Sequence, residues 1–480
     1  MRTTTNRTAV NGTWLWNLIM TLWIASLLWG GVSDKALLYA AQPETIDPRR
    51  SLVATEQVIL SRFSFERVMN QLVAQSGVPG LTALNLFHQW WDTQNPGPGL
   101  GLGPNCTGTL NDFPYTCRPA PAEGVQATTT PFVNPDTNLD AYLPIGLFNR
   151  FDLAPADGTH CGEYRIVYAK RSGISSPIQR NLLIFEAILP NPYPNQELAG
   201  CKKIVDFWAK LSKTDDINKR ADDLERLYFQ GLGDVEPVVH ISHYGDNANQ
   251  AGQVRTNQFM QSGPFVWNLR EFKLKRTCSD GGCSAMKFIP VTDKVNPFGA
   301  LHNADSTEPE APGYQAHFLT QVEDLAADSV SGIRFTVPDE YNSGQSLASG
   351  STETNYVVHF QAAMDSSFET FIQTELTRIG SSLTPDHIVQ RALSQSCAGC
   401  HQLLNNANIG GGLIWPASLG FTQVTERATE TVDGQTRFMI SPALLNVFLP
   451  QRQQIMENYL NDKLEKPENP KETLSGRVTH

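Results

Sequence analysis

The strongest structural signals in the chain are two apolar runs, Tyr164–Tyr168 (YRIVY) and Leu182–Leu189 (LLIFEAIL). Both are rich in aliphatic and aromatic residues and lie between polar or turn-forming residues, a pattern typical of buried strands. Other runs of this kind predict further strands at Pro237–Ile241, Phe265–Leu274, Met286–Val291 and Gly332–Val337. No βαβ rhythm repeats along these runs, so we expect antiparallel pairing.

Helical patterns lie on both sides of these strands. Apolar residues at helical spacing and terminal signals predict helices at Phe63–Gln75, Leu81–Thr93, Lys202–Leu211, Ile217–Phe229, Phe368–Ile379, Pro385–Ser396 and Pro442–Leu460. A hairpin is expected around Asp433-Gly434. The stretch Gly97–Asn138 is rich in Gly, Pro and Thr and predicts long ordered loops.

These elements predict an α+β chain that consists of one large and one small part. A β-rich α+β domain is expected over 45–345, followed by a connecting segment with a helix over 346–383. A small, mainly helical domain is expected over 384–461, and a charged flexible tail over 462–480. The large domain contains no catalytic constellation, so the sequence names no catalytic residue.

The small domain carries the chemical motif. Its first helix has a strong N-terminal signal, because Thr384 can cap it, Pro385 suits the first position and Asp386 places an acid in the first turn. The helix leads directly into Cys397-Ala-Gly-Cys400-His401. C-x-x-C-H is the sequence signature for covalent attachment of c-type haem. Thiols at this spacing reach the two vinyl groups of a porphyrin, and the adjacent histidine then lies under the iron.

The segment Thr384–Leu460 resembles a small c-type cytochrome domain. The resemblance rests on the capped helix before the motif, a Pro-containing loop after it and a closing helix. It implies one covalent haem c, with thioether bonds from Cys397 and Cys400 and with His401 as the proximal iron ligand. In that family a methionine from a later loop usually supplies the sixth ligand. The resemblance therefore implies that Met439, which lies just before the closing helix, is the distal ligand here.

The distal ligand has alternatives. Met439 also fits an ordinary strand residue that faces a core. The iron would then be five-coordinate, or a histidine such as His359 or His387 would bind it. A thioether ligand raises the haem potential and suits electron transfer.

Cys397 and Cys400 have three other interpretations. A redox dithiol prefers a helix N-terminus, whereas this motif follows the C-terminal end of a predicted helix. A zinc site needs a fourth ligand, and no second Cys/His cluster stands at a suitable spacing. A plain structural disulfide is the remaining alternative.

The N-terminal residues, 1–41, predict export. Arg2 and Arg7 precede Trp14–Gly30, which carries no charge and is long for a signal-peptide core but short for a membrane span. We expect a cleaved export signal or an uncleaved anchor. In either case the bulk of the chain lies in the periplasm or at the cell surface, and only this segment contacts the membrane.

The other cysteines agree with an oxidising compartment. There are eight cysteines, and six of them form neighbouring pairs along the chain. The simplest of the possible connectivities joins Cys106 to Cys117, Cys161 to Cys201 and Cys278 to Cys283. The last pair encloses Ser-Asp-Gly-Gly, which favours a tight turn.

Charge excludes one class of partner. The chain has 480 residues with 37 Lys+Arg against 48 Asp+Glu, a formal charge of −11, and no cationic cluster. Nucleic acid is therefore not expected as a partner.

Two functions remain from the sequence. The first is an exported c-type haem protein of electron transfer, whose large domain binds a redox partner protein or a substrate. The alternative is a disulfide-stapled periplasmic or cell-surface binding or structural protein without haem. A haem peroxidase-like enzyme is a third possibility, which requires an open iron site and a distal acid–base residue.

Overall fold

The structure is a computed structural model and describes residues 43–97, 102–118, 128–132, 136–259, 266–349, 351–363 and 366–476. The predicted export segment, 1–41, lies outside the described residues. Within the described ranges, no helix has the length and apolar character that crossing a membrane requires.

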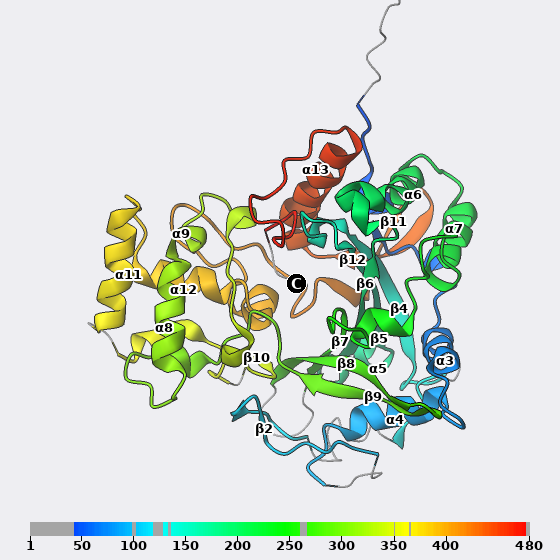
Figure 1. Cartoon of the computed structure of the whole chain (residues 1–480), viewed down its shortest axis with the longest axis horizontal. Coiled ribbons are helices and arrows are strands. Elements are labelled where there is room, and N and C mark those ends of the chain that lie inside the picture. Colours follow the sequence, from blue (N-terminus) through cyan, green and yellow to red (C-terminus); the bar gives the residue numbers. More distant parts are fainter. Residues whose placement is uncertain are drawn as a thin grey trace, which may run out of the picture. The chain divides into compact units, whose positions relative to one another are not determined.

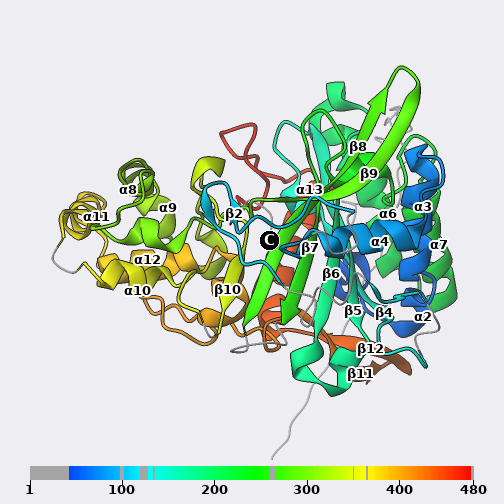
Figure 2. The ribbon, with the colours of Figure 1, turned by 90° about the horizontal axis from the view of Figure 1, so that it is seen from below.

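The largest sheet of the described residues has eight strands (Figures 1 and 2). Its order is β1-β4-β5-β6-β7-β8-β10, and β9 also pairs with β8. All these pairings are antiparallel. The strands are β1 (Val53–Ala54), β4 (Tyr142–Arg150), β5 (His160–Lys170), β6 (Asn181–Pro190), β7 (Gln253–Phe259), β8 (Trp267–Ser279), β9 (Gly282–Val291) and β10 (Ser346–Ala348).

Helices flank the sheet, with α8, α9, α11 and α12 on one side of the molecule and α3, α6 and α7 on the other (Figures 1 and 2). In chain order the helices are α1 (Pro48–Ser51), α2 (Gln57–Leu60), α3 (Phe65–Ser76), α4 (Ala83–Asp92), α5 (Ser172–Ser175), α6 (Lys202–Ser212), α7 (Ile217–Phe229), α8 (Ala311–Thr320), α9 (Val322–Leu325), α10 (Tyr356–Gln361), α11 (Ser367–Arg378), α12 (Pro385–Leu393) and α13 (Leu449–Leu460). Two short hairpins complete the fold, β2–β3 (Thr109–Leu110 and Phe113–Pro114) and β11–β12 (Val424–Val432 and Gln435–Ile440).

The two faces of the large sheet differ because side chains alternate along each strand. One face is aromatic and apolar and packs against the helices. Tyr168 of β5 contacts Phe65 of α3, with ring centroids 5.1 Å apart, and Tyr164 stacks on Trp208 of α6 at 6.1 Å. Arg165 follows Tyr164 directly and therefore points to the opposite face. On that face it lies opposite Glu186 of β6. The apolar face stabilises the fold, whereas the charged face is available for a site.

The predicted fold class and most predicted elements are confirmed. The chain is α+β, and the predicted helices at 63–75, 81–93, 202–211, 217–229, 368–379 and 385–396 correspond to α3, α4, α6, α7, α11 and α12. The hairpin at Asp433-Gly434 is β11–β12. The closing helix is α13, preceded by a π-helical turn at Leu444–Phe448.

The sequential disulfide pairing is also confirmed. Bonds join Cys106 to Cys117, Cys161 to Cys201 and Cys278 to Cys283. Such bonds are typical of an oxidising, exported environment.

Two predicted strands are wrong. Pro237–Ile241 and Gly332–Val337 are irregular segments. Val238, Val239 and Ile333 are fully buried, which explains their apolar character, but these segments do not pair with a neighbouring strand. The apolar residues of these two segments are therefore buried in the core without forming the backbone hydrogen bonds of a sheet.

The C-terminal segments pack on the sheet domain. Residues Glu44–His480 form one compact unit, so the expected boundary near 384 does not separate two compact units. The tail that we expected to be flexible, 462–480, is held over its described part. The backbone N–H groups of Ala156 and Asp157 donate to the carbonyls of Glu472 and Pro470 at 3.0 and 2.7 Å. Backbone pairing therefore orders a segment whose composition favours disorder.

Candidate functional site

The C-x-x-C-H motif lies in a helical turn of its own. α12 ends at Leu393, short of the predicted Ser396, and a new turn begins at Cys397 and continues as a π-helix over Gly399–Leu403. The Ser396 hydroxyl accepts a hydrogen bond from the Gly399 N–H at 3.1 Å and caps this turn. π-Helical turns are rare and frequent at functional sites.

His401 is held in one orientation. Its Nδ1 lies 2.9 Å from the carbonyl oxygen of Phe421, and because a carbonyl only accepts, Nδ1 carries the proton. Its ring stacks on Trp267 of β8, with centroids 5.6 Å apart. Burial lowers the pKa of His401 to about 4. The neutral ring therefore presents the lone pair of Nε2, which is how a metal-ligating histidine is prepared.

The two motif cysteines are buried and are not joined by a disulfide. Cys397 packs with Trp267 and Leu269 of β8, and Cys400 accepts a weak hydrogen bond from Gln423 at 3.8 Å. Burial raises the pKa of the Cys397 thiol well above its usual value. A redox dithiol requires a lowered pKa, so this environment does not favour that interpretation.

A cavity lies between the charged face of the sheet and the motif. Its apolar sheet wall consists of Phe148, Val167, Leu182, Ile184 and Leu269, and its charged sheet wall of Arg150, Arg165, Glu186 and Arg255. The opposite wall includes Cys400, His401, Gln423, Val424, Leu444, Phe448 and Arg452. The cavity holds about 820 Å³ free of protein atoms, including its open mouth, and about 90 Å³ of this admits the centre of a water molecule.

Both π-helical segments of the described chain border this cavity. The first contributes Cys400 and His401, and the second, Leu444–Phe448, contributes its two end residues. The widened turns place these side chains against the sheet.

The charged wall is a network of buried ion pairs. Arg165 contacts Glu186 at 3.1 Å, and Arg255 contacts Glu186 at 3.3 Å and Glu271 at 3.0 Å. These carboxylates are at most 1% exposed. Burial alone would raise the pKa of Glu186, but Arg165 and Arg255 reverse this and lower it. Carboxylates and guanidinium groups therefore share one low-dielectric surface beside the motif.

Arg180 fixes the loop that orients His401. It forms a bidentate ion pair with Glu426 at 2.8 and 3.0 Å, donates to the Gly420 carbonyl at 2.7 Å and to the Thr422 hydroxyl at 3.0 Å. These partners lie on either side of Phe421, whose carbonyl contacts His401. Arg180 is therefore a positioning residue for the motif.

The site has polar atoms that suit an acidic, mostly apolar ligand. Nη2 of Arg165 is buried and has no hydrogen-bond partner. Arg165, Arg150 and Arg255 line the same cavity as apolar side chains. A haem combines an apolar ring with two carboxylates and fits this donor set. Gln423 lines the cavity and is half-buried, and it would have to turn aside to admit a ring of that size.

The predicted distal ligand does not line the cavity. Met439 is half-buried on β12, and His359 on α10 also lies outside the cavity wall. His387 has a structural role, because its Nδ1 accepts from the Thr384 backbone N–H at 3.2 Å and completes the cap of α12. The assignment of Met439 as an iron ligand stays a prediction.

Sequence reasoning identified the motif but missed the wall that faces it. Arg165, Glu186 and Arg255 lie far from residue 400 in the chain, and each is only one residue of a strand. The signal that was present is the charge within otherwise apolar strands, such as Glu186 in LLIFEAIL.

Known proteins do not extend this description. No family model, curated protein or solved structure matches the chain.

Proposed function

We propose that the chain is an exported c-type haem protein that takes part in electron transfer. The observation that carries the proposal is His401. Its Nδ1 is engaged by the Phe421 carbonyl at 2.9 Å, so its Nε2 remains to bind iron, and it borders a cavity together with Cys400. The other six cysteines are bonded to one another, so Cys397 and Cys400 are the pair that the motif offers for thioether bonds.

Each group of residues has a role in this proposal. Cys397 and Cys400 hold the porphyrin covalently, and His401 supplies the proximal ligand. The guanidinium groups of Arg150 and Arg165 compensate the charge of the haem carboxylates, while the apolar wall excludes water. When bound, haem iron supplies one-electron chemistry between its ferric and ferrous states.

The proposal includes a location outside the cytoplasm. The three disulfides support a periplasmic or cell-surface location. A redox partner protein is the expected electron donor or acceptor, and the sheet domain is the expected place for it to dock.

The test is a reduced-minus-oxidised pyridine haemochrome spectrum, with the intact mass of the denatured protein. The protein is produced in a host that has c-type haem maturation machinery. We expect thioether-bound haem in the wild type and in a Cys278→Ala/Cys283→Ala control, which also removes a cysteine pair. The Cys397→Ala/Cys400→Ala variant should lack covalent haem. A colourless wild type beside a working maturation control would refute the proposal and leave the stapled binding protein.

A second candidate is a haem enzyme with an open iron site. The observation that favours it is the cavity wall, in which the described residues include no methionine and no histidine apart from His401. The cavity wall contains Glu186 and Arg165, which supply a carboxylate and a cation beside the motif.

An imidazole titration of the haem-loaded protein separates the two candidates. A saturable spectral change indicates an open site, as expected for the enzyme. No change indicates a six-coordinate carrier, and a Met439→Ala variant that then gains imidazole binding would identify its ligand.

A further inference from the structure

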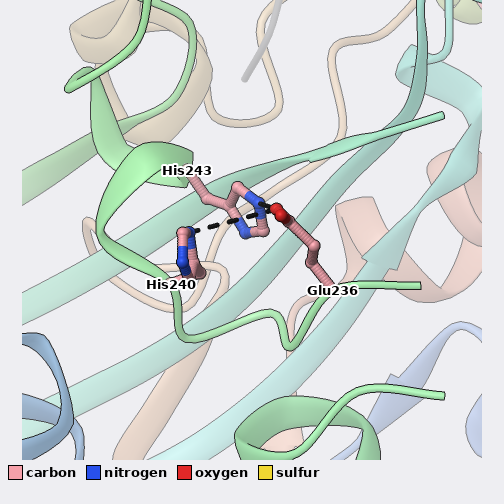
Figure 3. A group of neighbouring side chains, drawn as sticks. All are labelled: Glu236, His240 and His243. Atoms are coloured by element: carbon pink, nitrogen blue, oxygen red, sulfur yellow. Dashed lines mark hydrogen bonds and ion pairs between the residues drawn. The ribbon is translucent and has the colours of Figure 1, made fainter. Parts of the chain in front are cut away.

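A second group of ligating side chains lies outside the cavity, between α7 and β7. Glu236, His240 and His243 converge there (Figure 3). They come from the loop after α7 and from the single 3₁₀ turn Ile241–Tyr244 that follows it. One ligand atom from each residue lies within 4.8 Å of those from the other two. The group is independent of the haem proposal.

His243 is the most deeply buried residue of this group. It is 1% exposed, and both its ring nitrogens face oxygen atoms. Nδ1 lies 3.2 Å from the Val238 carbonyl, and Nε2 lies 2.9 Å from Oε2 of Glu236. A neutral imidazole can donate from only one nitrogen. With Nδ1 donating to the carbonyl, the Nε2 lone pair faces a carboxylate oxygen. A metal ion between the two atoms would stabilise this arrangement.

His240 completes the group from the solvent side. Its Nδ1 lies 4.0 Å from Oε2 of Glu236 and 2.6 Å from the hydroxyl of Ser242, and its ring centroid is 5.1 Å from that of His243. Its side chain is 30% exposed and that of Glu236 is 53% exposed, so ions reach the site from solvent.

The surrounding charge does not oppose a cation. Arg276, the nearby cation that acts on His240, is paired with Asp246 at 2.5 Å. When both histidines coordinate through a nitrogen lone pair, the Glu236 carboxylate gives the ligand set a charge of −1. A divalent ion is therefore attracted to it.

We propose that Glu236, His240 and His243 bind a Zn²⁺ ion and leave one coordination position for water. Nitrogen ligands favour zinc over calcium and magnesium, which prefer oxygen. Two histidines, one carboxylate and a water form a recognised tetrahedral zinc set. The Val238 carbonyl has the role of an outer partner, because it fixes the tautomer of His243 that exposes Nε2. The ion ties the loop after α7 to the turn that leads toward β7.

Zinc binding is measured by titration of the full chain with Zn²⁺ against a chromogenic chelator. All samples carry Cys397→Ser/Cys400→Ser, which removes the other thiol and histidine combination that could hold zinc. His240→Ala is the test variant, because this side chain is partly exposed and its removal does not open the core. His317→Ala, on the distant helix α8, is the matched control.

We expect one equivalent of Zn²⁺ on the background protein and on the His317→Ala control. The His240→Ala variant should bind at least ~100-fold more weakly, since even the loss of an outer partner costs ~10–100-fold. Glu236→Gln should weaken binding in the same direction and keeps the size of the side chain. The proposal is overturned if the background protein binds no zinc, or if His240→Ala and Glu236→Gln bind it as tightly as the control.

Discussion

Replacement of Arg180 by alanine should destabilise the chain and release the loop that orients His401. The Arg180 side chain is 4% exposed and that of Glu426 is 0% exposed. Removal of one partner from a buried ion pair costs about 3–5 kcal/mol, because the other charge stays buried without compensation. The Gly420 carbonyl and the Thr422 hydroxyl lose a donor as well. We therefore expect a loss of about 4 kcal/mol in the free energy of unfolding.

The double variant Arg180→Ala/Glu426→Ala tests the origin of that loss. It removes the buried charge that the single variant leaves behind, so it should be more stable than Arg180→Ala, by about 2 kcal/mol. The assay is urea unfolding followed by tryptophan fluorescence, to which Trp267 beside His401 contributes.

An exposed ion pair supplies the control. Arg378 pairs with Glu323 at 3.1 Å, but the side chains are 57% and 69% exposed. Arg378→Ala should cost less than about 1 kcal/mol. If Arg180→Ala costs no more than this, or if the losses of the single variants simply add in the double variant, the argument from the buried pair fails.

Further predictions concern the disulfides and one buried histidine. Loss of the Cys161–Cys201 bond, which closes a 40-residue separation, should cost about 4 kcal/mol, against about 2 kcal/mol for the 5-residue Cys278–Cys283 bond, in the chain-entropy account. Paired Cys→Ala variants measured by thermal unfolding check the order, and equal losses would contradict it. Burial lowers the pKa of His302 to about 3, so the unfolded chain takes up a proton first on acidification. Between about pH 7 and about pH 5 this should remove about 2 kcal/mol of stability, and a His302→Asn variant should show a correspondingly flatter pH profile in urea unfolding.

The sequence predicted strands well where their buried residues are apolar. β5 and β6 have long aliphatic runs and were found. β7 was missed because Arg255 and Asn257 occupy buried positions, where they face the charged network and no longer look like core residues. β4 was missed because Pro144 and Gly146 interrupt it, and the structure accommodates them with a register shift opposite β5.

The site was predictable only in its local part. Cys397, Cys400 and His401 are adjacent in the chain, so their spacing alone indicates the chemistry. The wall that they face comes from separate strands and required the fold. The proposed zinc ligands Glu236 and His243 were missed for a related reason, because they flank Pro237–Ile241, and an extended strand there would hold its two ends apart. The irregular loop brings them together.

The burial of the motif has a consequence for the biogenesis of the protein. Cys397 is 1% exposed and Cys400 is 8% exposed. If haem is attached as we propose, porphyrin has to be joined to these buried thiols before the chain has finished folding. A chain that folds before haem is attached can then no longer be converted to the haem-bound form. Haem added later to the folded, colourless protein should therefore stay unattached.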